Sequence, residues 1–179
     1  MNTNWHDALL PHWGTIFSSD LQSHFLLAKR EGDVSSTDAP SVTEPSTAPS
    51  PTQAAVPNWE AVQRAAEQGN AMAQYYLGAL YATGTGGVAQ NTQEAAAWYH
   101  KAAEQGLAIA QNNLGFLYAT GQGVGQDYVV AYQWTTLAMA GGYADAANNL
   151  NLLAQHMTSI QIEQAQQLAQ AWTAGHPQA

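Results

Sequence analysis

The sequence predicts an all-α fold in which residues 58–174 form an α-solenoid of stacked antiparallel helix pairs. Three observations support this prediction. The stretch at 65–84 returns 37 positions later, with AAEQG and LYATG unchanged. A third, partial copy (AANNL) begins at residue 146, 36 positions after its counterpart. The one-residue difference falls in a glycine-rich loop, where an insertion leaves the flanking helices intact. Repeats of this length are typical of stacked helix pairs.

The repeat also predicts the order of the helices. The expected helices cover residues 59–68, 70–83, 91–105, 107–120, 127–140, 143–156 and 159–173. Asn91 and Asp127 suit the starts of the second helix of each pair, because their side chains accept free backbone N–H groups. Asn91 with Glu94 approximates a capping box. Ser159 is interpreted as a capping residue of the last helix rather than as a nucleophile.

Glycines mark both the ends and the middles of the expected helices. Gly69, Gly106 and Gly141 are predicted to end helices in the left-handed conformation. Gly78 and Gly115 fall in mid-helix, where glycine costs about 1 kcal/mol relative to alanine. We therefore expect the partner helix to approach closely at these two positions.

Large apolar residues indicate how the pairs pack. Trp98 and Trp134 are expected to fill the space between neighbouring pairs, and Val88 and Val124 to bring the loops into the core. The last helix is expected to act as a capping helix with a wet outer face. Its inward residues are predicted to be Ile162, Ala165, Leu168, Ala169 and Trp172, and its outward ones Gln161, Gln164, Gln167 and Gln170.

Two segments precede the repeats. Residues 1–31 have spaced apolar residues, which predict a short amphipathic helical segment broken near Pro11 and Gly14. Residues 32–57 contain five Pro and nine Ser or Thr. Because such a composition buries too little apolar surface to offset chain entropy, we expect a disordered linker there. Residues 175–179 are expected to form a tail.

Composition excludes several classes of function. The chain has 13 Asp and Glu against 4 Lys and Arg, a net charge of −9. Four cations do not neutralise a row of phosphates, which argues against nucleic-acid binding. The absence of cysteine excludes disulfides, thiolate zinc sites and cysteine nucleophiles. No apolar run is long enough for a membrane span. The N-terminus lacks the features of a secretory signal, so we expect a cytoplasmic location, with the periplasm as the alternative.

The repeated motifs resemble the Sel-one-like repeat family, which is related to tetratricopeptide repeats. The shared pattern is Ala-Gln-x-x-Leu-Gly-x-Leu-Tyr-x-x-Gly-x-Gly-Val, followed by Gln-Asn or Gln-Asp, Ala-x-x-Trp and Ala-Ala-Glu-Gln-Gly. The last helix is similar to the end segment of many bacterial members. The resemblance implies an adaptor: a right-handed superhelix whose concave face, lined by first helices, binds a protein or peptide. Some secreted members are cysteine-rich, and activities ascribed to them do not transfer to this chain.

A second resemblance concerns the N-terminal segment. Trp5-His6-Asp7-x-Leu9, Phe25-Leu26 and Glu31-Gly32 are similar to the opening helices of bacterial uracil-DNA glycosylases. The water-activating motif of those enzymes, Gly-Gln-Asp-Pro-Tyr-His, is absent. The resemblance therefore implies no glycosylase activity.

Candidate catalytic and metal-binding residues are few. Glu67 and Glu104 are repeat-equivalent, which favours a structural role over acid–base work. His6 and His12 are too weakly supported as a metal pair, and we expect His100 and His156 to lack a carboxylate at ligand spacing. The glycine loop at 121–125 follows no strand, so it is a connector rather than a phosphate loop. We expect no catalytic site, no metal and no cofactor. A hydrolase remains the alternative function, without a nucleophile–base pair to support it.

The positive candidate is a groove along the first helices. In the usual solenoid register, it is lined by Met72, Tyr75, Ala79, Ile109, Asn112, Phe116, Asp145, Asn148, Leu152 and His156. Asparagine amides can pair with an extended peptide backbone, and the aromatic and aliphatic residues offer apolar contact. Two other interpretations stay open: some of these residues pack against the adjacent repeat, or the segment from Trp5 to Leu26 occupies the groove. The partner's identity and the oligomeric state are not specified.

Overall fold

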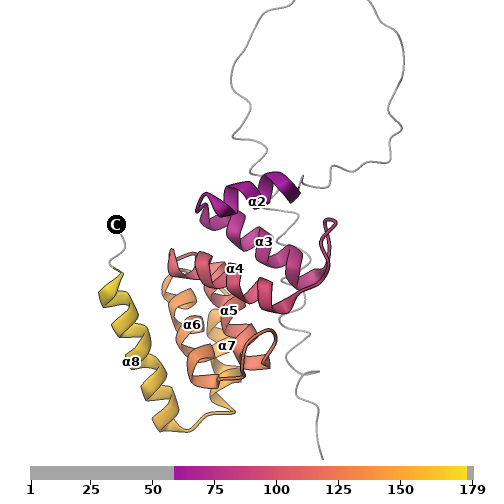
Figure 1. Ribbon diagram of the computed structural model, residues 1–179. Coiled ribbons are helices and arrows are strands. Elements are labelled where there is room, and N and C mark those ends of the chain that lie inside the picture. Colours follow the sequence, from indigo (N-terminus) through magenta and orange to yellow (C-terminus); the bar gives the residue numbers. More distant parts are fainter. Residues whose placement is uncertain (1–58, 177–179) are drawn as a thin grey trace, which may run out of the picture. The chain divides into compact units, whose positions relative to one another are not determined.

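The described part of the chain is a stack of α-helices. The computed structural model describes residues 59–176, and in that range it contains seven helices and no strand (Figure 1). Their bounds are α2 (Trp59–Glu67), α3 (Ala71–Thr83), α4 (Thr92–Glu104), α5 (Ala108–Thr120), α6 (Tyr128–Ala140), α7 (Ala146–Ala154) and α8 (Ser159–Gly175). The predicted all-α repeat solenoid is confirmed. The expected segments 1–31 and 32–57, and the glycosylase resemblance, lie outside the described residues.

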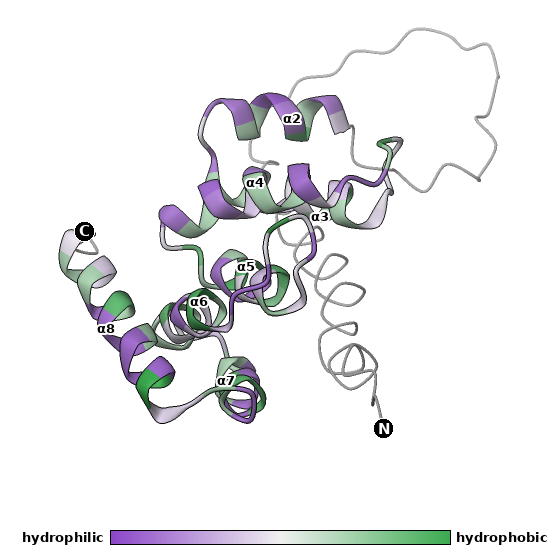
Figure 2. Cartoon of the chain, turned by 60° about the horizontal axis from the view of Figure 1, so that its bottom comes forward, coloured by the Kyte–Doolittle hydropathy of each residue, from purple (hydrophilic) through white to green (hydrophobic). Residues whose placement is uncertain are grey.

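Consecutive helices pack in series. α3 pairs with α4 and α5 with α6, while α4 packs on α5 and α6 on α7. α2 covers α3 at one end, and α8 packs against α6 at the other. Figure 2 shows that α8 carries both hydrophilic and hydrophobic residues along its length. No described helix is both long and apolar enough to cross a bilayer.

The two full repeats share hydrogen bonds as well as sequence. The side-chain amide of Gln74 donates to the Ala66 carbonyl at 3.1 Å, and that of Gln111 donates to the Ala103 carbonyl at the same distance. In each case, a glutamine of a first helix adds a bond to a carbonyl near the end of the preceding helix, which also accepts from the backbone N–H of the glycine three residues later at 3.0 Å. The recurrence at 37 residues shows that the repeat is structural.

The predicted N-caps of the second helices form. The Asn91 side chain accepts from the backbone N–H groups of Gln93 and Glu94 at 3.1 and 3.2 Å. The Asp127 side chain accepts from those of Val129 and Val130 at 2.8 and 3.1 Å. The reciprocal capping box forms at α8 instead, where Thr158 is the cap and Gln161 returns the bond. Ser159, the expected cap, is the exposed first residue of that helix.

One predicted helix end is wrong by one residue. Gly69 and Gly106 have positive φ angles of 92° and 83°, as expected. Gly141, however, has a φ of −76°, and the left-handed residue is Gly142, with a φ of 85°. Gly142 lies 36 residues after Gly106, so the period itself identifies the correct glycine.

The mid-helix glycines mark close helix contacts, as predicted. A Cβ atom at Gly78 would lie 2.8 Å from the ring of Tyr99, and one at Gly115 would lie 2.5 Å from the Thr135 hydroxyl oxygen. Real Cβ contacts are essentially never this short. The equivalent residue of the third copy is Asn151, which is exposed. Glycine is therefore required where a second helix crosses, and α7 lacks such a crossing at this position.

α8 repeats the tryptophan motif of the second helices, but it packs against α6 rather than pairing with α7. Ala95-x-x-Trp98 and Ala131-x-x-Trp134 return as Ala169-x-x-Trp172 in α8, and the rings of Trp134 and Trp172 meet edge to face at 6.0 Å. Trp134 is buried and meets α8, whereas Trp98 packs on the cluster of Ala66, Ala73 and Leu77, which includes its own partner helix α3.

The predicted inward face of α8 is correct with one exception. Ala165 and Ala169 are buried, and Ile162 and Trp172 are half-buried. Leu168 is 39% exposed, so its inward placement is wrong. α8 contacts α6 through the stripe that contains Ala165, Ala169 and Trp172, and Leu168 lies at the edge of that stripe, one turn before Trp172, where it stays partly exposed. α7 is also shorter than expected, since it begins at Ala146 rather than at residue 143.

Candidate functional site

The structure divides the predicted groove residues into two groups. Side chains of the first group are buried and thus engaged inside the fold: Tyr75, Ala79, Asn112 and Phe116. Side chains of the second group are exposed or half-buried: Met72, Ile109, Asp145, Asn148, Leu152 and His156. The predicted set therefore does not form one continuous open surface, because α5 in the middle of the stack is covered on most of its circumference.

Asn112 shows why the middle positions are covered. It is 0% exposed, and its side-chain oxygen accepts a hydrogen bond of 2.9 Å from the amide of Asn149 in α7. This bond links the first helices of two adjacent repeats. Tyr75, the equivalent residue one repeat earlier, is buried with its ring 5.8 Å from that of Tyr99. These positions belong to the contact between neighbouring helices.

The same positions are open on α7. Asn148 is equivalent to Asn112 by the repeat spacing, yet it is exposed and makes no side-chain hydrogen bond within residues 59–176. Leu152, equivalent to the buried Phe116, is half-buried. Nearby, the His156 ring stacks on Tyr128 of α6 at 5.5 Å. We call Asn148, Leu152 and His156 the α7 face. It exposes the positions that a following repeat covers elsewhere in the stack.

A buried polar cluster lies between the first two repeats. The hydroxyl of Tyr99 and the side-chain oxygen of Asn113 are both buried and have no hydrogen-bond partner among the described residues. Burial raises the pKa of the Tyr99 hydroxyl well above its ordinary value; the neighbouring Tyr75 adds to the rise, and Asn113 opposes it. The two groups lie near each other without reaching hydrogen-bond geometry. The cluster is fully enclosed, which separates it from any surface site.

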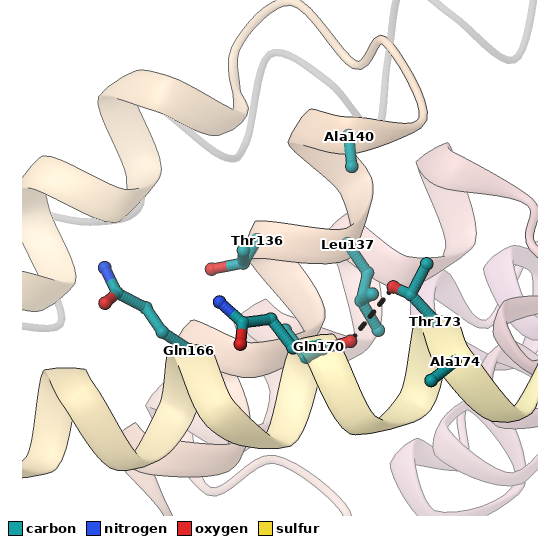
Figure 3. A pocket seen from close by; sticks show the side chains of 8 residues that line it. Thr136, Leu137, Ala140, Gln166, Gln170, Thr173 and Ala174 are labelled. Carbon is teal, nitrogen blue, oxygen red and sulfur yellow. Dashed lines mark hydrogen bonds between the residues drawn. The ribbon is translucent and has the colours of Figure 1, made fainter.

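A groove that sequence reasoning missed lies between α6 and α8. It has a volume of about 720 Å³ and no ionisable side chain in its lining. The lining residues are Thr136, Leu137, Ala140, Gln166, Ala169, Gln170, Thr173 and Ala174 (Figure 3). The signal that could have indicated it is the third tryptophan motif, because Trp172 places α8 beside α6 rather than only at the end of the stack.

Catalytic chemistry has little support in the described region. No three His, Asp or Glu residues of residues 59–176 gather as metal ligands. His100 lies 3.5 Å from Glu104 on the exposed surface of α4, one turn away along the same helix. Glu67 accepts a hydrogen bond of 2.9 Å from Gln63, also in its own helix. These contacts are typical of helix surfaces.

Comparisons with known proteins agree with the repeat geometry. A family model, Sel1 repeat, matches residues 71–107 and 108–143. No match was found among curated proteins.

Two solved structures are similar to this chain. The first is a protective antigen of uropathogenic Escherichia coli with an SLR fold, with a TM-score of 0.62 and 38% identity over 65% of this chain and 25% of that one. The second is a Sel1 repeat protein from Oxalobacter formigenes, with a TM-score of 0.51 and 40% identity over 52% of this chain and 37% of that one. This chain spans well under two thirds of either protein. The repeat geometry, the family model and these neighbours agree that the chain carries two consecutive Sel1 repeats within an all-α solenoid.

Proposed function

We propose that this chain is a non-enzymatic interaction module, or adaptor, which binds a protein or peptide partner through the first helices of its repeats. The observation that carries the proposal is the contrast between Asn112 and Asn148. Asn112 is buried and bonded to the next repeat, whereas Asn148 presents the same amide to solvent. The α7 face thus offers a partner the contacts that one repeat normally offers the next.

The chemistry of the α7 face suits a peptide or helix. The Asn148 amide supplies one acceptor and two donors. Leu152 supplies apolar contact beside it, and the His156 ring is already ordered by stacking on Tyr128. Met72 and Ile109, which are exposed and half-buried on the earlier first helices, extend the same set of positions along the stack. The buried members, including Tyr75 and Phe116, contribute by holding these helices in place.

A capture experiment tests the α7 face. The full chain is immobilised, bacterial lysate is passed over it, and bound proteins are quantified by mass spectrometry. We expect Asn148→Ala combined with Leu152→Ser to lower capture of the specific partner at least about tenfold, the effect of losing one or two well-placed contacts. The matched control, Asn151→Ala with Gln155→Ala, changes two exposed residues of the same segment and should retain capture.

The outcome is decisive in both directions. Equal capture by both variants, at unchanged melting temperature, would remove the α7 face from the proposal. The non-enzymatic assignment is tested separately with a panel of hydrolase substrates. Turnover that a single substitution abolishes would overturn it.

A further inference from the structure

The groove between α6 and α8 is a second candidate binding surface, separate from the α7 face. We propose that it binds a short, extended, uncharged peptide segment, and that Gln166 and Gln170 recognise the backbone of that peptide. The proposal uses none of the residues of the α7 face, so it goes beyond the proposed function and can fail independently of it.

The floor of the groove is apolar and fixed. Leu137 and Ala169 are buried, with 5% and 4% of their surface exposed, and both line the groove. The Thr136 and Thr173 hydroxyls donate to carbonyls one turn earlier in their own helices, at 2.8 and 3.0 Å. Both hydroxyl protons are therefore already in hydrogen bonds within their own helices. The groove offers an occupant apolar contact along its floor.

Two glutamines along one edge have unused hydrogen-bonding capacity. Gln166 and Gln170 are exposed, and neither side chain makes a hydrogen bond within the described range. Figure 3 shows both side chains extending from α8 into the space facing α6. Each amide has a carbonyl acceptor and an NH₂ donor, the complement of a peptide group. A pair of such groups can hold a backbone irrespective of its sequence.

The spacing of the two glutamines fits an extended chain. Residues four apart on a helix are separated by about 6 Å along its axis. Residues two apart in an extended strand are separated by about 6.6 Å and face the same side. Gln166 and Gln170 can therefore pair with alternate peptide groups of one strand. A helical occupant does not match, because its peptide groups are bonded internally.

Charge restricts the occupant. The chain has a net charge of −9, yet no lining residue of this groove is ionisable. A charged side chain lowered onto the apolar floor would lose hydration without gaining a partner. The lined part of α8, from Gln166 to Ala174, is about 12 Å long at 1.5 Å per residue. It accommodates about four extended residues, so we expect an uncharged core of that length.

Selection from a random library tests the proposal. Random dodecapeptides displayed on their own mRNA are selected on the immobilised full chain, and enriched sequences are made as fluorescein-labelled peptides. We expect a core of about four uncharged residues. Gln166→Ala with Gln170→Ala should weaken binding about tenfold, as expected for losing two hydrogen bonds. Gln164→Ala with Gln167→Ala, on another face of α8, is the matched control and should leave binding unchanged.

Backbone recognition has its own readout. N-methylation of alternate residues in the peptide core should weaken binding about tenfold, whereas exchange of uncharged side chains should not. Three results would overturn the proposal: no enrichment above that on the double variant, enriched peptides that bind the double variant equally well, or a concentration-dependent dimer in sedimentation that the double variant abolishes. The last result would assign the groove to a second copy of this chain.

Discussion

α5 and α7 occupy equivalent places in successive repeats but have opposite environments. In α5, ten of the thirteen residues are buried, including the polar Gln111, Asn112 and Asn113. In α7, only Ala146, Asn149, Leu150 and Leu153 are buried. The comparison shows that a residue type in a repeat does not have one role. The equivalent asparagine is a core contact in α5 and a surface group in α7.

The mid-helix glycines give the largest expected effect within this comparison. A Cβ atom at position 115 would lie 2.5 Å from the Thr135 hydroxyl oxygen and 3.0 Å from the Ala131 carbonyl oxygen. The rest of a leucine side chain would need still more space. We expect Gly115→Leu to lower the free energy of unfolding by about 3 kcal/mol or more through overpacking. Asn151→Leu, at the equivalent exposed position, should change it by less than about 0.5 kcal/mol. Urea unfolding monitored by circular dichroism measures both, and similar losses for the two variants would contradict the comparison.

The asparagine pair gives the next effect. Asn112→Ala leaves the Asn149 amide buried without its acceptor, so we expect a loss of about 2 kcal/mol. Asn148→Ala removes an exposed amide and should cost less than about 0.5 kcal/mol. A double-mutant cycle with Asn149→Ala isolates the pair: coupling should appear for residues 112 and 149 and be absent for residues 148 and 149.

The buried tyrosine makes a prediction about pH. Burial raises the pKa of Tyr99 in the folded state. The stability that comes from keeping this hydroxyl protonated is therefore fully present below the unfolded-state pKa of about 10, and it is lost as the pH rises toward the folded-state pKa. Tyr99→Phe should change stability by less than about 0.5 kcal/mol at pH 7, since the hydroxyl has no hydrogen-bond partner among residues 59–176. Above pH 10 the variant should lose stability less steeply than the natural chain, by up to about 1.4 kcal/mol per pH unit. Parallel curves for the two proteins between pH 9 and 12 would refute this.

The smallest expected effect concerns salt. The α7 face, the exposed Met72 and the half-buried Ile109 contain no permanently charged side chain. Partner binding should therefore change less than about threefold between 50 and 500 mM NaCl, because little of it depends on screened charges. Captured partner is measured at both concentrations. A tenfold decrease would indicate that charged residues such as Asp145 carry the binding.

The sequence was sufficient to predict the repeat, and most of the helix bounds, caps and close contacts that follow from it. A period of 36 or 37 residues locates each helix pair, and the caps at Asn91 and Asp127 and the contacts of Gly78 and Gly115 follow from short-range geometry. At the end of α6, where two glycines are adjacent, the period identifies Gly142 rather than Gly141 as the left-handed residue.

Burial of the predicted groove residues could not be read from one repeat. Whether Asn112 or Asn148 faces solvent depends on how many repeats follow, which is a property of the stack. The α6–α8 groove depends on where α8 packs, and its glutamines look like an ordinary wet helix face in the sequence. Leu168 was misplaced for the same reason, because α8 contacts α6 along a narrower stripe than a capping helix was expected to use.

Hydrogen exchange on the full chain alone tests the central contrast most directly. Amide protection is measured by mass spectrometry in peptides that cover Asn112–Phe116 in α5 and Asn148–Leu152 in α7. We predict that the α5 amides exchange only through global unfolding, while those of α7 exchange through local opening at least about tenfold faster. Equal protection of the two helices would contradict the view that α7 is the more exposed of the two.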